Sequence, residues 1–200
     1  MQIKRTYDPI GHTYYHILSG TFDRRLSKFN TWSQKESGYY FLVLDEMFSS
    51  FLRNVSEDEE IRNPASGDYS FLSISTSTAV NLSRKVTGTH LTMSMAEKLL
   101  ARWATRKWFT FMDCDRRITV GVRTLSLMSS YLHSKFSIFL CNVCTFTCLI
   151  GLTCHKCHLC IHYHCLEGGT AQNHPCPTCN VAMSGVQYLV PKEVHEEMEE

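Results

Sequence analysis

The chain has 200 residues, of which 44% are hydrophobic and 20% charged, and its formal net charge is +1. This composition is that of an ordinary globular protein, and the length allows one large domain or two to three small ones. No apolar run approaches the roughly 20 residues that a membrane span needs, and residues 1–15 lack the apolar segment of a secretory signal, so we expect no membrane partner.

The first part of the chain yields few clear elements. Residues 1–35 show no regular period, whereas apolar residues between Tyr39 and Val55 recur at three- and four-residue steps, which predicts an amphipathic helix. The acidic run at 57–60 and Asn63-Pro64 are expected to end it. Aromatic and β-branched residues then indicate a short strand over Tyr69–Ser75.

Residues 92–132 are easier to interpret. Ser94 and Glu97 have capping-box spacing, so we expect a helix to begin there. Its buried face is predicted to consist of Ala96, Leu99, Leu100 and Trp103. Segments 108–112 and 117–120 predict a hairpin around a turn at 113–115, and Leu125, Met128 and Leu132 indicate another helix after Gly121. This order is typical of the end of a winged-helix domain, which we favour over a generic small α+β domain.

The same region carries an excess of positive charge. From Arg84 to Arg123 there are nine Lys and Arg residues against three acids. Phosphate binding would make use of such a surface, so weak DNA contact is one hypothesis. Because the cations are spread around the predicted helix and hairpin, we favour protein docking, and solvated side chains are the plain alternative.

The last third of the chain predicts two zinc sites. Nine of the ten cysteines lie between 141 and 179, which argues for metal-bound thiolates in a reducing compartment and against a disulfide scaffold. Two intervening residues let one tight turn present both ligands of a pair to a tetrahedral ion. The four pairs are Cys141 and Cys144, Cys154 and Cys157, His162 and Cys165, and Cys176 and Cys179.

The spacing leaves the grouping of the pairs open. The ions could be bound sequentially, by pairs one and two and then by pairs three and four, or in an interleaved way, with pairs one and three sharing one ion. Four protein ligands per ion leave no position for water, so both zinc ions are expected to be structural. The module has about forty residues, too few for an adequate core, and metal binding must therefore contribute to its folding.

The ligand order C4HC3 fits both the variant RING and the PHD finger. Cys176-Pro177-Thr178-Cys179 resembles the end of a RING, and His174 stands where a PHD finger usually has an aromatic residue. Val143 resembles the aliphatic residue with which RING domains contact a ubiquitin-conjugating enzyme. We favour the variant RING. Exchange of one ligand for a neighbour such as Cys160 or His164 remains an alternative.

With these motifs, the chain resembles the non-SMC element one family, the RING-bearing subunits of the SMC five-six DNA-repair complex. Segments 95–100, 107–109 and 118–120 resemble the family's second winged helix and its wing, and 67–75 resembles the end of its first. The resemblance implies tandem winged helices that dock a MAGE-type subunit, which joins a kleisin. It also implies a nuclear, chromosome-associated RING-type E3 ubiquitin ligase in recombinational repair.

On this basis the expected fold class is α+β, a winged-helix region followed by a small C4HC3 variant RING. The predicted parts are a first winged-helix-like domain at 1–80, a second at 81–136, the RING at 137–183 and an acidic tail at 184–200. The span between Ser75 and Leu91 looks too short for a complete second winged helix, so one of its helices should be reduced or missing.

Other departures bear on the predicted activity. Leu166–Pro175 contains no Trp, and Asn180 stands where strongly active RINGs often have a basic residue. We therefore expect partner-dependent ligase activity, with a purely structural assembly subunit as the alternative. Cys114 lies between Asp113 and Asp115, which disfavour its thiolate, so no covalent ubiquitin thioester and no catalytic residue on this chain are expected.

Overall fold

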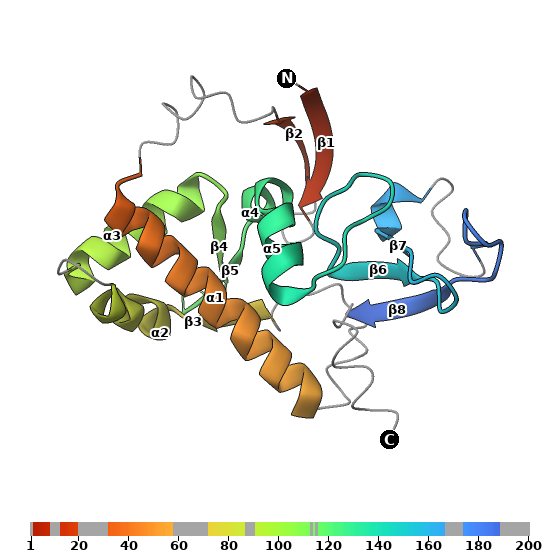
Figure 1. The fold of residues 1–200 in the computed structure, drawn as a ribbon. Helices are drawn as coiled ribbons and strands as arrows, with labels where there is room; N and C mark the ends of the chain where they lie inside the picture. Colours follow the sequence, from red (N-terminus) through yellow and green to blue (C-terminus); the bar gives the residue numbers. More distant parts are fainter. Residues whose placement is uncertain are drawn as a thin grey trace. The chain divides into compact units, whose positions relative to one another are not determined.

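The computed structural model describes residues 2–8, 13–19, 32–57, 72–86, 91–112, 114, 116–166 and 174–188. It is a mixed α/β structure (Figure 1). The chain divides into two compact units. Unit 1 combines Met1–Phe51 with Tyr69–Thr124, and unit 2 combines Leu52–Asp68 with Leu125–Glu200. None of the helices in the described residues has the length and hydrophobicity needed to span a membrane.

Among the residues that the structure describes, unit 1 combines two small sheets with α-helices. Strands β1 (Gln2–Asp8) and β2 (Thr13–Ser19) form an antiparallel hairpin. The long helix α1 (Gln34–Glu57) begins in this unit and is followed by β3 (Ser73–Ser75), α2 (Thr76–Asn81), the 3-10 turn η4 (Leu82–Lys85) and α3 (Met93–Thr105). Strands β4 (Phe109–Met112) and β5 (Arg117–Val120) form the predicted hairpin.

Helix α1 confirms the amphipathic helix predicted from Tyr39 onward and begins five residues earlier. A capping box starts it: Glu36 Oε2 accepts from the Ser33 N–H at 2.8 Å, and the Ser33 hydroxyl accepts from the Glu36 N–H at 3.3 Å. Helix α1 is described as far as Glu57. The rest of the acidic run and Asn63-Pro64, which were expected to end the helix, lie outside the described residues.

Helix α3 confirms the predicted buried face but not the predicted start. Its buried residues are Ala96, Leu99, Leu100 and Trp103. The N-cap is Thr92, whose hydroxyl accepts from the Met95 N–H at 3.2 Å, so the capping box predicted at Ser94 is wrong. Leu91 and Ala96 are buried on either side of the cap, at the positions of a hydrophobic staple, which favours the earlier start.

The sheet of unit 1 joins segments that are far apart in the sequence. Its order is β3-β5-β4, and Ser73 of β3 lies opposite Thr119 of β5. The short strand predicted to end a first domain therefore pairs with the wing predicted in a second. Both segments lie in unit 1, so the predicted division between residues 80 and 81 does not coincide with a boundary between the compact units.

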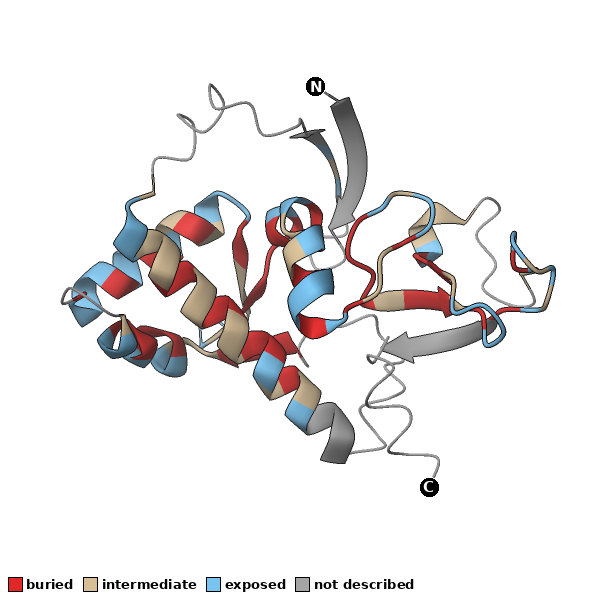
Figure 2. Ribbon diagram, viewed as in Figure 1, coloured by how far each residue is buried: buried red, intermediate tan, exposed pale blue. Residues whose placement is uncertain are grey.

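An aromatic cluster forms the core of unit 1. The ring of Trp32 lies 4.9 Å from that of Tyr40, 5.3 Å from Trp103 and 5.0 Å from Trp108, measured between centroids. The hydroxyl groups of Tyr40 and Thr124 also share a hydrogen bond, with their oxygens 2.7 Å apart. Figure 2 shows buried residues recurring along the helices and strands of this unit. Burial of several large rings provides a core that needs no metal.

Unit 2 carries the cysteine-rich segment. After α4 (Val122–Leu127), which starts at the end of unit 1, come α5 (Ser129–Phe136), β6 (Ile150–Thr153), β7 (Cys160–Ile161), the 3-10 turn η5 (Tyr163–Cys165) and β8 (Ser184–Tyr188). The helix predicted after Gly121 is broken at Met128. The sheet order is β7-β6-β8, so the residues predicted to begin an acidic tail form an edge strand.

Candidate metal centre

The eight predicted ligands gather in two clusters. Within each cluster the four ligand atoms all lie within 4.8 Å of one another. One cluster combines the first and third pairs and the other the second and fourth, which is the interleaved arrangement. The clusters are Cys141, Cys144, His162 and Cys165, and Cys154, Cys157, Cys176 and Cys179.

Three of the four pairs share one local backbone structure. After each C-x-x-C, the N–H of the next residue donates to the carbonyl of the first cysteine, at 2.8 Å for Thr145, 2.7 Å for His158 and 2.8 Å for Asn180. Each of these residues has a left-handed φ, between 55° and 64°. The N–H of the first cysteine in turn donates to the carbonyl of the residue that follows this left-handed residue. This repeated turn, here called the knuckle, places both thiols on the same side.

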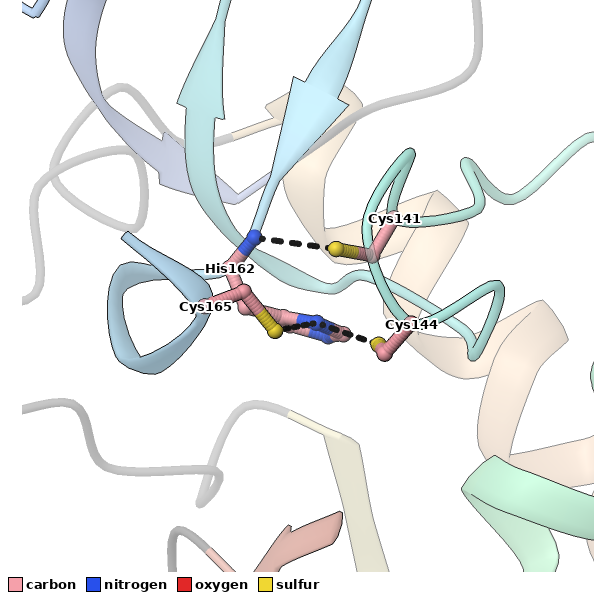
Figure 3. Close-up of side chains that lie close together, drawn as sticks. All are labelled: Cys141, Cys144, His162 and Cys165. Atoms are coloured by element: carbon pink, nitrogen blue, oxygen red, sulfur yellow. Dashed lines mark hydrogen bonds between the residues drawn. The ribbon is translucent and has the colours of Figure 1, made fainter. Parts of the chain in front are cut away.

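In the first cluster the imidazole of His162 is oriented by hydrogen bonds on both nitrogens. Nδ1 lies 3.3 Å from Cys144 Sγ and 3.8 Å from Cys165 Sγ, and the four side chains point toward one another (Figure 3). Nε2 lies 3.0 Å from the Thr147 carbonyl oxygen. Because a carbonyl can only accept, Nε2 donates to it, and Nδ1 is the nitrogen that faces the thiols, which is the orientation of a metal-ligating histidine.

The second cluster consists of four thiols. Cys154 and Cys179 have their sulfurs 3.3 Å apart, Cys157 and Cys176 3.5 Å, and Cys157 and Cys179 3.8 Å. Sulfurs around a tetrahedral zinc with bonds of about 2.3 Å would be separated by about 3.8 Å. The thiol spacing therefore fits a zinc ion with only small adjustments.

The electrostatics of both clusters favour a cation. The neighbouring thiol of Cys144, followed by Cys165, holds the pKa of Cys141 well below its ordinary value. Burial lowers the pKa of His162, but the thiols of Cys141 and Cys144 raise it to about 10. The negative charge of this cluster thus attracts a proton to the imidazole, and a metal ion would take its place.

In the second cluster, burial raises the pKa of Cys154, but backbone N–H groups, led by that of Cys157, lower it to about 6. Such N–H groups are part of the knuckle, whose geometry stabilises the thiolate that zinc requires.

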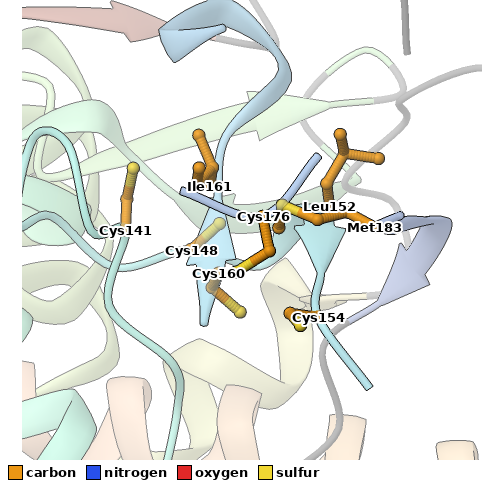
Figure 4. Close-up of a cluster of buried hydrophobic side chains, with 8 residues drawn as sticks. All are labelled: Cys141, Cys148, Leu152, Cys154, Cys160, Ile161, Cys176 and Met183. Atoms are coloured by element: carbon orange, nitrogen blue, oxygen red, sulfur yellow. The ribbon is translucent and has the colours of Figure 1, made fainter. Parts of the chain in front are cut away.

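The spare cysteines and histidines lie outside both clusters. Cys148 and Cys160 are buried in the small core beside the sites together with Leu152 and Met183 (Figure 4). His164 stacks on His162 with ring centroids 4.6 Å apart and contributes no ligand atom to either cluster. Neither Cys160 nor His164 belongs to the two groups of potential ligand atoms, which consist of the eight predicted residues.

Other residues singled out in the sequence lie on the surface. Val143, in the first knuckle, is 58% exposed, which leaves it free to contact a protein. Asn180 is exposed in the left-handed position of the last knuckle. Cys114 is exposed as well, while its neighbours Asp113 and Asp115 lie outside the described residues. The Thr147 carbonyl was not anticipated, since any residue type offers a carbonyl and the sequence carries no signal for it.

Together, these features define a class of protein: a mixed α/β chain whose C-terminal unit contains two interleaved clusters of four potential zinc ligands. No protein-family model matches the sequence, and neither does any curated protein. Among solved structures, the chain is similar to a chain of the Nse1-Nse3-Nse4 complex, with a TM-score of 0.50 and 17% sequence identity. The match covers 93% of this chain and 73% of the other. At this identity it shows a shared fold, in agreement with the resemblance found in the sequence.

Proposed function

We propose that this chain is a non-SMC element one subunit, a RING-type protein of the SMC five-six complex in the nucleus, where it acts in DNA repair. The observation that carries the proposal is the interleaved order of the four ligand pairs, combined with the fold likeness to a chain of the Nse1-Nse3-Nse4 complex. The order α1, β3, α2, α3, β4, β5 supports a winged helix within unit 1. The expected partners are a MAGE-type subunit and a kleisin.

Zinc fits the chemistry of both clusters. All eight ligands would hold two Zn²⁺ ions, which supply folding free energy and no catalysis, since four protein ligands close each site. In an E3 ligase of this kind, the chain would hold a ubiquitin-charged conjugating enzyme close to a substrate lysine. The gain in rate would come from proximity and orientation. Val143 offers an exposed apolar contact for that enzyme, in a turn held by the first cluster.

The ligase proposal is tested with the zinc-loaded full chain, its MAGE-type partner, activating enzyme, ubiquitin and a panel of conjugating enzymes. Formation of ubiquitin chains is expected, and Val143→Ala should reduce it about tenfold through loss of an interface side chain. Lys156→Ala is the matched control, because Lys156 occupies the same position in the second knuckle and is exposed. Absence of ubiquitin chains with every conjugating enzyme would refute the ligase activity.

A non-catalytic assembly subunit is the second candidate, favoured by Asn180, which gives the last knuckle no basic side chain next to its final cysteine. In this case, Val143→Ala leaves repair in cells intact, while Cys154→Ala unfolds the zinc module and abolishes co-purification of the partners. If both variants lose repair while the complex still assembles, the ligase proposal is favoured.

Weak DNA contact through unit 1 is a third, independent proposal. Lys98, Arg106, Lys107 and Arg123 are exposed, and the Arg123 N–H donates to the Lys107 carbonyl, so the last two are neighbours. Phosphate contacts would make the affinity for a labelled DNA duplex fall steeply with salt. No binding at low salt, or an affinity that does not depend on salt, would exclude this contact.

A further inference from the structure

A buried chain of polar groups connects the first cluster to the junction of α4 and α5. It starts at His162, whose Nε2–H donates to the Thr147 carbonyl oxygen at 3.0 Å. The N–H of the same threonine donates to the Ser129 hydroxyl oxygen at 3.2 Å. His162, Thr147 and Ser129 are each at most 7% exposed. Three buried polar residues from separate segments of unit 2 therefore lie in one hydrogen-bonded path.

Ser129 is the first residue of α5, and it uses both functions of its hydroxyl. The O–H donates to the Leu125 carbonyl at 2.7 Å, with the Ser126 carbonyl at 3.1 Å, while the oxygen accepts from the Thr147 N–H. The helix break at Met128 gives α5 an N-cap without a side-chain hydrogen bond. This hydroxyl thus satisfies a carbonyl of α4 and at the same time holds the loop that leads to β6.

Thr147 takes part through its backbone only. Its N–H also faces the Leu125 carbonyl at 3.3 Å, and residue 147 forms an isolated β-bridge with Leu140. Its own hydroxyl is buried and has no hydrogen-bond partner among the described residues. The Thr147 carbonyl belongs to the following peptide unit, whose Cys148 N–H donates to the Phe139 carbonyl at 2.8 Å. The backbone of Thr147 is therefore held on both sides, by Ser129 at its N–H and by Phe139 at the next N–H.

We infer that Ser129 is a positioning residue for the first metal cluster: through the Thr147 N–H it helps to hold the loop whose Thr147 carbonyl orients the imidazole of His162 toward the three thiols. Partners of a ligating histidine typically change metal affinity by about 10- to 100-fold when they are removed. Ser129 acts one residue further away, through a backbone carbonyl. The inference rests on the proposed zinc module but adds a residue that neither the ligand pattern nor the fold likeness identifies.

The experiment uses the full-length chain, with Co²⁺ as a spectroscopic probe and Zn²⁺ in competition with a chromophoric chelator. The two clusters differ in donor set, three sulfurs with one nitrogen against four sulfurs, so their Co²⁺ absorption bands differ. Ser129→Ala should lower the affinity of the first cluster about tenfold and alter its bands. The second cluster should keep its affinity and bands, and it shows in each sample that the module has folded.

Two further variants separate positioning from a general effect on α5. Ser129→Thr keeps the hydroxyl and should restore the affinity of the first cluster. Ser134→Ala is the matched control, because its hydroxyl donates to the Tyr131 carbonyl on the exposed side of the same helix. It should leave both clusters unchanged.

The results that would overturn the inference are equally specific. The positioning role would be refuted if the first cluster bound metal equally well in the wild type and in Ser129→Ala, or if both clusters lost affinity equally. Either result would leave the proposed function standing. A wild-type chain that takes up fewer than two Co²⁺ ions would instead refute the zinc module on which the proposed function depends.

Discussion

Glu36 joins two helices of unit 1 through one carboxylate. Oε2 completes the capping box of α1 with Ser33, and Oε1 accepts from Arg102 of α3 at 2.5 Å. Burial raises the pKa of this carboxyl, but the Ser33 N–H and the Arg102 guanidinium lower it below 4.5 overall. The ionised form is therefore favoured by folding.

This predicts a pH dependence for the stability of unit 1. Because the pKa is lowered in the folded state, the contribution of Glu36 is fully present above about pH 4.5 and is lost as pH falls through the folded value. Glu36→Gln should cost about 0.5–1 kcal/mol at pH 7, since the pair is partly solvated, and progressively less below pH 4.5. Melts followed by tryptophan fluorescence at several pH values measure this.

Glu97→Gln is the control, because Glu97 is exposed on α3, where it caps no helix. The same pH-dependent loss in both variants would contradict the assignment to Glu36.

The knuckles make a second prediction at the scale of single residues. Thr145 has φ 64°, which is costly for a β-branched side chain, whereas Asn180 at φ 57° is a residue type that tolerates this conformation. Thr145→Gly should therefore stabilise the zinc-loaded module by about 1 kcal/mol, and Asn180→Gly should change it little. Chelator-induced unfolding compares the two, and an equal effect of both would argue against strain at Thr145.

Capping shows what could and could not be predicted at this scale. Ser33 and Glu36 have the same S-x-x-E form as Ser94 and Glu97, yet only the first pair caps a helix. The signal was present in both places. The choice depended on burial around Thr92, which a local pattern does not contain.

At the scale of elements, two glycines of unit 1 have different surroundings. Gly38 lies inside α1, and a Cβ there would meet nothing within 4 Å, whereas at Gly121 a Cβ would clash with the Lys107 carbonyl oxygen. The second glycine therefore allows the chain leaving β5 to pass close to the turn after α3, where the Gly121 N–H donates to the Trp108 carbonyl at 2.8 Å.

Opposite effects of the same substitution are expected. Gly38→Ala should stabilise unit 1 by about 0.5–1 kcal/mol, because it removes conformational freedom from the unfolded chain and suits a helix. Gly121→Ala should destabilise it by about 1–3 kcal/mol, because backbone must move. Denaturant unfolding measures both, and stabilisation by Gly121→Ala would contradict the packing described for this turn.

The elements themselves were easier to predict than their pairing. The face of α3 and the hairpin follow from local periodicity, and both are confirmed. The partner of β3 could not be predicted from local periodicity, because Ser73–Ser75 is a three-residue strand whose pairing with β5 spans more than forty residues. Nothing in so short a strand distinguishes the end of one domain from the beginning of a sheet.

At the scale of the whole molecule, the two units differ in what stabilises them. All three tryptophans of the chain lie in the aromatic core of unit 1, whereas the buried cluster around the metal sites consists largely of cysteine. Unit 1 can bury a core unaided, and the zinc module cannot.

Removal of metal should therefore unfold one part of the chain only. With excess chelator, amide signals of residues 139–183 are expected to collapse toward random-coil positions, while tryptophan fluorescence changes little. Two-dimensional NMR and fluorescence on the same sample measure this. The alanine variants of Cys141 and Cys154 should each imitate the effect, and Cys114→Ala is the control. A cooperative loss of both signals would show that unit 1 also depends on zinc.

The grouping of the ligand pairs could not be predicted at any scale from spacing alone. Both the sequential and the interleaved arrangements satisfy two residues between ligands. Only the three-dimensional structure, in which Cys141 forms a β-bridge with Cys160 of β7, brings Cys141 and His162 together. The ligand types were thus predictable, but their partners were not.

The interleaving has a consequence for how the protein is made. During synthesis, the first four ligands to leave the ribosome are Cys141, Cys144, Cys154 and Cys157, a complete set of thiols that does not share one site in the folded chain. Zinc captured by this set must be handed over once His162 and Cys165 emerge, and the second site stays incomplete until Cys179 does. The rate at which free zinc reaches the nascent chain would therefore determine whether the module folds directly or first forms a non-native site from these four cysteines.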